Sequence, residues 1–244
     1  EALRGPAAEA LATQARDLSA VAGDLRDLDV QIDEVLRPRA AQGGADAAGF
    51  ATLAAALEAR RGDARARLRA ALTGAQGRAL LFDLSAFVAL RGWLRPADHG
   101  QTAGLARPAQ KTAVKALDRL WKKARRAAPE ALAPDAADTP RHALREDLKK
   151  LRYAVEFLSP AFAPKAAKPF RRRLKRLQDA FGALNDGAVA ERLFAGEAPP
   201  AAEDPAAQRA AGRLLGALAV QAEADREAAR DGWQALVDEP RFWR

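Results

Sequence analysis

Alanine occupies 64 of the 244 positions of this chain, whereas Val, Ile and Thr together occupy only 16. Ala loses no side-chain entropy in a helix, and the β-branched residues that favour strands are scarce here. A chain of this length can bury a sizeable core, as one large domain or as two small ones. The composition therefore predicts an all-α protein.

Clusters of Gly and Pro divide the chain into long segments with helical periodicity. The first segment and the one at 166–196 contain Asp-rich stretches, where we expect a bend or a turn. Asp27, Asp29 and Asp186 are interpreted as turn or cap residues rather than as metal ligands. The predicted helices cover residues 5–36, 50–73, 76–94, 107–128, 140–158, 166–184, 186–196 and 205–237.

Several classes of site and location are disfavoured by what the sequence lacks. The absence of Cys excludes disulfides, thiol nucleophiles and thiolate metal sites, and two histidines, His99 and His142, make a histidine-rich metal site a poor fit. No apolar run reaches the roughly 18 residues needed to span a bilayer, and no signal peptide is visible. We therefore expect a cytoplasmic protein without a metal, a cofactor or a membrane partner.

The basic residues are concentrated in one zone. Three short runs, at 107–126, 141–152 and 165–178, hold 20 of the 40 Lys and Arg residues but only 3 of the 32 acidic residues. Solvated helix faces usually interleave the two signs, whereas runs of cations repel one another unless an anion binds them. The distribution favours a polyanion-binding surface over a merely solvated one.

In each of three predicted helices a basic ridge runs beside an apolar seam. The seams have the spacing of helical bundles and consist of Val114, Leu117, Trp121 and Ala124, of Leu144, Leu148, Leu151, Val155 and Leu158, and of Phe170, Leu174, Leu177, Phe181 and Leu184. The ridges are Lys111, Lys115, Arg119, Lys122 and Arg126, then His142, Arg145, Lys149 and Arg152, then Lys168, Arg171 and Lys175. If the seams share one core, the ridges are expected to converge on one groove.

A faint internal repeat relates the two halves of the chain. Residues 25–30 (LRDLDV) resemble residues 184–189 (LNDGAV), but the first half has no counterpart of the helix that contains His142. We therefore predict a first repeat at 1–96 that lacks its opening helix, a linker at 97–106 and a second repeat at 107–244.

Two further motifs give the chain a resemblance to a known family. Residues 141–157 (RHALREDLKKLRYAVEF) and 174–186 (LKRLQDAFGALND) are similar to the two signature motifs of the CHAD family, the conserved histidine α-helical domain. The LRDLDV stretch and the closing Phe242-Trp243 also fit that family. The resemblance implies two pseudo-symmetric four-helix units built from long antiparallel helical hairpins.

The resemblance also implies a function. It implies binding of inorganic polyphosphate in a basic groove or central pore, no catalysis by the domain, and association with polyphosphate granules or with a fused CYTH-type triphosphatase domain. Carried over by position, the binding residues are His142, Arg145, Lys149, Lys150, Arg152, Tyr153, Lys175 and Arg176. The charge pattern adds Lys111, Lys115, Arg119, Lys122, Arg126, Lys168, Arg171 and Arg172.

Some alternatives remain open at this point. His142 fits a phosphate contact as well as a helix-start bond to a carboxylate, and Tyr153 fits the edge of the core better than a ligand contact. Nucleic acid is a disfavoured partner, because only Tyr153 among the aromatic residues lies on a basic ridge and single-strand binders interleave aromatics with cations. A hydrolase of phosphoanhydrides would need clustered carboxylates for a metal, and the basic zone has few. An alanine-rich scaffold for a protein partner is the third alternative, and the oligomeric state is open.

Overall fold

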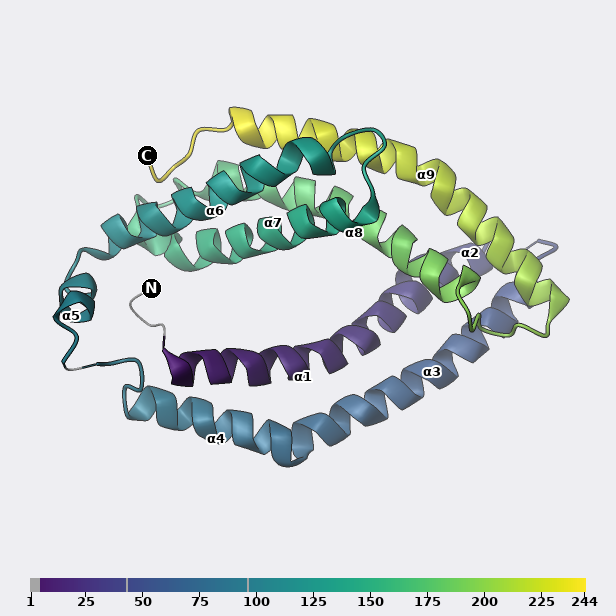
Figure 1. Ribbon diagram of the computed structural model, residues 1–244. Coiled ribbons are helices and arrows are strands. Elements are labelled where there is room, and N and C mark those ends of the chain that lie inside the picture. Colours follow the sequence, from purple (N-terminus) through teal and green to yellow (C-terminus); the bar gives the residue numbers. More distant parts are fainter. Residues whose placement is uncertain (1–4, 43, 96) are drawn as a thin grey trace. The chain divides into compact units, whose positions relative to one another are not determined.

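The computed structural model describes residues 5–42, 44–95 and 97–244, and every regular element within these residues is helical. The prediction of an all-α fold is therefore confirmed. The elements, which Figure 1 shows in chain order, are α1 (Pro6–Val30), a π-helical segment (Gln31–Leu36), α2 (Arg37–Ala40), α3 (Ala47–Thr73), α4 (Ala75–Ala89), α5 (His99–Leu105), α6 (Ala109–Ala131), α7 (Asp138–Leu158), a 3₁₀ turn (Ser159–Ala161), α8 (Lys168–Ala195) and α9 (Pro205–Asp238).

The contacts between residues divide the chain into two compact units. Unit 1 comprises residues 1–106 and 193–213, and unit 2 comprises residues 107–192 and 214–244. Helices α8 and α9 therefore each contribute residues to both units. The predicted linker contains the short helix α5. The repeat boundaries and the pseudo-symmetry inferred from the sequence stay predictions.

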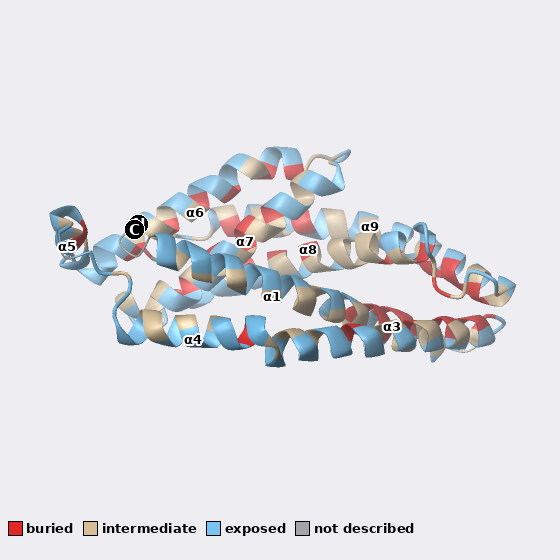
Figure 2. Cartoon of the chain, turned by 60° about the horizontal axis from the view of Figure 1, so that its bottom comes forward, coloured by how far each residue is buried: buried red, intermediate tan, exposed pale blue. Residues whose placement is uncertain are grey.

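In unit 1, α1 packs against both α3 and α4. Gly49 is needed for the approach of two backbones, since a Cβ at that position would lie 2.2 Å from the carbonyl oxygen of Ala206. Helix α4 has a largely exposed surface (Figure 2) that includes apolar side chains such as Leu81 and Phe82. The large, fully buried side chains of this unit come from the π-helical segment and from α3; they include Ile32, Leu36, Leu53 and Leu57.

The helix that begins with α1 does not turn at its Asp-rich stretch, so the turn or cap role predicted for Asp27 and Asp29 is wrong. The chain continues through the π-helical segment, in which the amide of Arg37 donates to the carbonyl of Ile32. Pro38 follows directly, and its ring would clash with the carbonyl four residues earlier in a regular α-helix, so the widened turn relieves that contact. Asp29 lies 3.6 Å from Arg61 of α3 and contributes to an ion-pair cluster instead.

The break predicted between residues 184 and 186 is also absent. Helix α8 runs without interruption from Lys168 to Ala195, and Asp186 lies in its interior. The Asn-Asp-Gly sequence favours a turn locally, and a helical Gly costs about 1 kcal/mol relative to Ala. Burial of Ala190 and Phe194 farther along the same helix offsets this local preference.

Unit 2 has a continuous core to which α6, α7, α8 and α9 contribute. The three predicted seams are confirmed, because their central residues are buried and the end residues Val114, Leu158 and Leu184 pack against them. Aromatic rings join the helices: Trp121 of α6 meets Phe170 of α8 edge to face with ring centroids 5.8 Å apart, and it stacks on Trp233 of α9 at 5.6 Å. This core fixes which face of each helix is left for solvent.

Candidate functional site

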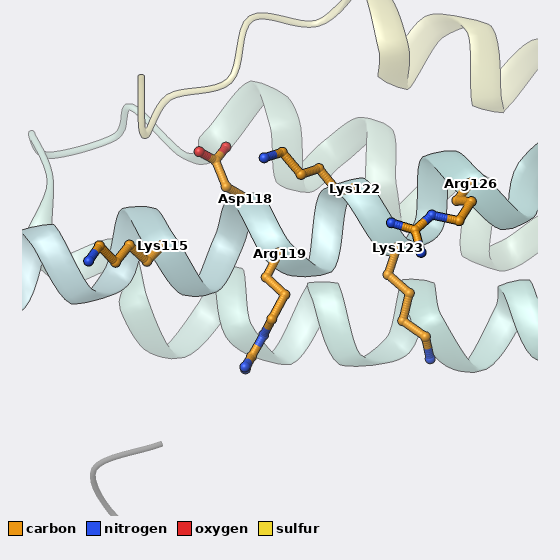
Figure 3. Close-up of a pocket in the computed structure, with 6 residues that line it drawn as sticks. All are labelled: Lys115, Asp118, Arg119, Lys122, Lys123 and Arg126. Atoms are coloured by element: carbon orange, nitrogen blue, oxygen red, sulfur yellow. The ribbon is translucent and has the colours of Figure 1, made fainter.

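The basic row of α6 lies on the exposed side of that helix, opposite Leu117, Trp121 and Ala124. Four members of this row, together with Asp118 and Lys123, line a surface hollow of about 560 Å³ and are drawn in Figure 3. The hollow is lined by Lys115, Asp118, Arg119, Lys122, Lys123 and Arg126. Within the part of the chain that the structure describes, four cations of this row form no ion pair; they are Lys111, Lys115, Lys122 and Arg126. Their charges are therefore available to an external anion.

The basic row of α7 has acidic partners on its own helix. Glu146 lies 2.9 Å from Lys149 and 3.6 Å from Arg145, and Glu156 lies 3.8 Å from Arg152. Partial burial opposes ionisation of Glu146, but the hydrogen bond from Lys149 and the positive charges of Lys149, Arg145 and His142 outweigh it and lower the pKa of this carboxyl. These cations are thus held in place, and partly neutralised, before any ligand binds.

A buried ion pair joins α6 to α7. The Nζ of Lys123 donates to Oδ1 of Asp147 at 2.7 Å, and Asp147 is only 5% exposed. On α6, Arg119 and Arg126 lie about one turn from Lys123; on α7, Lys150 lies about one turn from Asp147. The ion pair therefore joins α6 to α7, but Asp147 is about 200° around the helix from both Arg145 and Lys149, so it lies on the other side of α7 from the basic row.

The basic row of α8 is exposed on the side opposite Phe170, Leu174 and Leu177. One member, Lys175, pairs with Asp179 at 2.7 Å. A groove common to all three rows stays a prediction. The row consists of Lys168, Arg171, Arg172, Lys175 and Arg176.

The tail that follows α9, residues 239–244, returns to α6. Asp118 accepts hydrogen bonds from the indole Nε1 of Trp243 at 3.0 Å and from two nitrogens of Arg244 at 3.1 and 2.7 Å. The hydrogen bond from Arg244 is the main cause of a lowered pKa for the Asp118 carboxyl; partial burial opposes it, and Trp243 and Arg241 reinforce it. Sequence reasoning noted Trp243 but not its two neighbouring arginines, because nothing local marks a contact with a residue so distant in the chain.

Comparison with known proteins identifies the family. The profile of the CHAD domain matches residues 1–195. The chain belongs to the CHAD family. None of the curated proteins gives a significant match to the sequence.

Two solved structures have a similar fold. The fold is similar to that of the CHAD domain from the plant Ricinus communis, with 26% identity and a TM-score of 0.66 over 96% of this chain and 73% of that one. It also resembles PptA from Streptomyces chartreusis, with 22% identity and a TM-score of 0.62 over 93% of this chain and 79% of that one; this second likeness bears on the fold alone. A CHAD domain is not itself a catalytic domain.

The residues of the first CHAD motif have distinct environments in α7. Tyr153 is 54% exposed, with the guanidinium of Arg152 4.9 Å from its ring centroid, so the preference for a core-edge position is wrong. His142 is exposed and forms no hydrogen bond with a carboxylate of the described residues, so it acts on Glu146 only as a nearby charge. Lys150 is exposed without an ion-pair partner in the same residues.

Within the described residues, no helix combines the length and the apolar character that a membrane span requires.

Proposed function

We propose that this CHAD domain binds inorganic polyphosphate on the basic face of unit 2 and does not hydrolyse it. The observation that carries the proposal is the α6 row, in which three unpaired cations, Lys115, Lys122 and Arg126, line a hollow of about 560 Å³. Helix α7, which Lys123 and Asp147 join to α6, carries the second basic row.

Polyphosphate suits such a face because it offers a string of negative charges without bases or sugars. A protein that neutralises several phosphates together releases their counterions, as described for nucleic acids. Arg can bind phosphate oxygens in a bidentate manner, and Lys supplies a mobile point charge. The separation between Lys111 and Arg126, about 22 Å along the helix axis, spans several phosphates of an extended chain. Membership of the CHAD family, whose motifs implied polyphosphate binding, supports this choice among polyanions.

Nucleic acid is the competing ligand. It would use the same cations, and the exposed ring of Tyr153 offers one stacking surface. Competition at equal phosphate concentration separates the two: long-chain polyphosphate is expected to displace single-stranded DNA or RNA far more effectively than the reverse. Preferential retention of nucleic acid would overturn the proposal.

Charge reversal on the α6 row tests the location of the site. Lys115→Glu with Lys122→Glu is expected to weaken polyphosphate binding by about 100-fold or more, because two charge-assisted contacts become repulsive. Both side chains are exposed, so circular dichroism is expected to show unchanged helix content. The charge-preserving variant Lys115→Arg with Lys122→Arg is the control. Arg145→Glu with Lys149→Glu tests the α7 row in the same assay, and wild-type affinity in both reversed variants would refute the placement.

The non-catalytic role and the location have their own tests. Incubation of the chain with polyphosphate and Mg²⁺ or Mn²⁺ is expected to release no orthophosphate; steady release would show hydrolysis. We also propose a cytoplasmic role at polyphosphate granules, with or without a partner triphosphatase domain. A fluorescently labelled chain is expected to co-localise with granules, and the α6 charge-reversed variant to lose that localisation.

A further inference from the structure

Asp118 is the only acidic residue among residues 107–126, and it lies within the cationic hollow of α6. Lys115 and Lys122 are its neighbours about one turn away on either side. An unneutralised carboxylate at this place would repel a phosphate chain at the centre of the proposed binding face. The structure surrounds this carboxylate with cations that come from outside the three basic rows.

Those cations belong to the tail. Arg244 uses Nε and one terminal nitrogen to bind both oxygens of Asp118, at 3.1 and 2.7 Å, and Arg241 adds a second positive charge at 3.8 Å. The two-point contact of a guanidinium with a carboxylate is the strongest ion-pair geometry available to these side chains. Asp118 and the two arginines together carry a net positive charge.

Apolar packing holds the tail in this position. Trp243 is 3% exposed and lies edge to face against Phe170, with ring centroids 4.9 Å apart. Phe242 packs against Phe162 in the same manner at 5.2 Å. The indole of Trp243 then donates to Asp118 from a fixed position. Because these rings anchor the segment, loss of the Arg244 side chain alone is not expected to release it.

We infer that the tail is a functional part of the anion site: Arg244, assisted by Arg241, neutralises Asp118 and so keeps the hollow of α6 uniformly cationic. Arg244 is thus a positioning and charge-compensating residue. This inference rests on the proposed function, since it assigns a role within the same binding face. Two consequences distinguish it from a purely structural contact.

The first consequence is compensation between the two partners. Arg244→Ala exposes the charge of Asp118 and is expected to weaken polyphosphate binding by about tenfold, an effect of the size of one charged contact. Asp118→Asn removes the negative charge itself, so this variant is expected to bind polyphosphate at least as tightly as the wild type. The double variant, Arg244→Ala with Asp118→Asn, is expected to recover wild-type affinity within about threefold. A merely structural pair would behave differently, because both single variants and the double variant would all bind less tightly.

Two control variants show whether the recovery of affinity is specific to the Asp118–Arg244 pair. Arg244→Lys keeps the charge and is expected to retain most of the affinity. Arg173→Ala also removes a cation that contacts the tail, through Glu239 at 3.5 Å, but it does not touch Asp118. Addition of Asp118→Asn to Arg173→Ala is therefore expected to yield no recovery. Equal recovery in the Arg173 background, or none in the Arg244 background, would overturn the inference.

The second consequence does not require a ligand. The charged groups that face Asp118 are Arg241 and Arg244 of the tail and Lys115 and Lys122 of α6. An NMR titration of the Asp118 carboxyl is expected to give a pKa below the ordinary value in the wild type and a higher one in Arg244→Ala. If the pKa of Asp118 is the same in the wild type and in Arg244→Ala, the inference is overturned, whether or not the wild type binds polyphosphate. If the pKa shifts but the wild type does not bind polyphosphate, only the proposed function is overturned.

Discussion

The salt dependence of binding offers a quantitative test of the α6 row. Neutralising Lys115 and Lys122 with Ala removes two of its four unpaired cations without introducing repulsion. For single-stranded nucleic acids each neutralised phosphate contributes about 0.7 to the slope of log K against log salt concentration. With the same coefficient for polyphosphate, this variant is expected to lower the magnitude of the slope by about 1.4. The loss of affinity is accordingly larger at low salt than at high salt.

Isothermal titration calorimetry or fluorescence anisotropy at four or five salt concentrations measures this slope directly. Lys115→Arg with Lys122→Arg is the charge-matched control and is expected to reproduce the wild-type slope. Arg226→Ala with Arg230→Ala removes the same total charge from α9, where both arginines pair with Glu223. This second control separates a local contact from an effect of net charge.

The decisive quantity is the difference between the two charge-removal variants. If the α9 variant changes the slope as much as the α6 variant, the attraction depends on overall charge and the α6 hollow is not the site. An α6 variant with a wild-type slope would refute the reasoning more directly, because it would mean that neither lysine neutralises a phosphate.

Two further predictions concern individual carboxylates. Glu146→Gln frees Lys149 and Arg145 from their acidic partner, so the affinity for polyphosphate is expected to rise a few-fold in calorimetry. A loss of affinity would contradict a role for Lys149 and Arg145 in binding. Asp118 has a lowered pKa in the folded protein, so its interactions stabilise the fold above the unfolded-state pKa of about 4 and are lost as the pH falls through the folded-state value. Thermal unfolding is therefore expected to show the wild type more stable than Asp118→Asn by about 1 kcal/mol at pH 7, and this difference in stability is expected to shrink below pH 4. A difference that stays constant at all pH values would count against the ion pair.

The features that could be predicted from the sequence are those with a local signal. The apolar seam of α7 is readable because its spacing places Leu144, Leu148 and Leu151 on one side of a helix, and all three are buried. The exposed position of the α6 row follows from the same geometry. Family motifs added Lys150 and Tyr153, which periodicity alone does not mark.

The features that sequence reasoning missed depend on contacts between distant segments. Asp118 and Arg244 are 126 positions apart, and no pattern around either residue indicates that they meet. The uninterrupted course of α8 was obscured by a turn-like sequence at Asn185 and Asp186, whose local preference the packing of Phe194 overrides. The pairing of Arg145 and Lys149 with Glu146 was missed for another reason: counting acids per run does not show which charges touch.

These pairings suggest different roles for the basic rows of α6 and α7. On α6 the unpaired lysines have no internal partner to give up, so a phosphate that approaches them gains their full attraction. On α7, a phosphate must share Lys149 with Glu146 or displace that carboxylate, and the net gain is smaller. The same carboxylate restricts the motion of Lys149 before binding, which lowers the entropy lost when the complex forms. We therefore expect the α6 row to supply most of the attraction. We expect the α7 row, whose cations Glu146 and Glu156 hold, to supply a preformed geometry for a chain of phosphates.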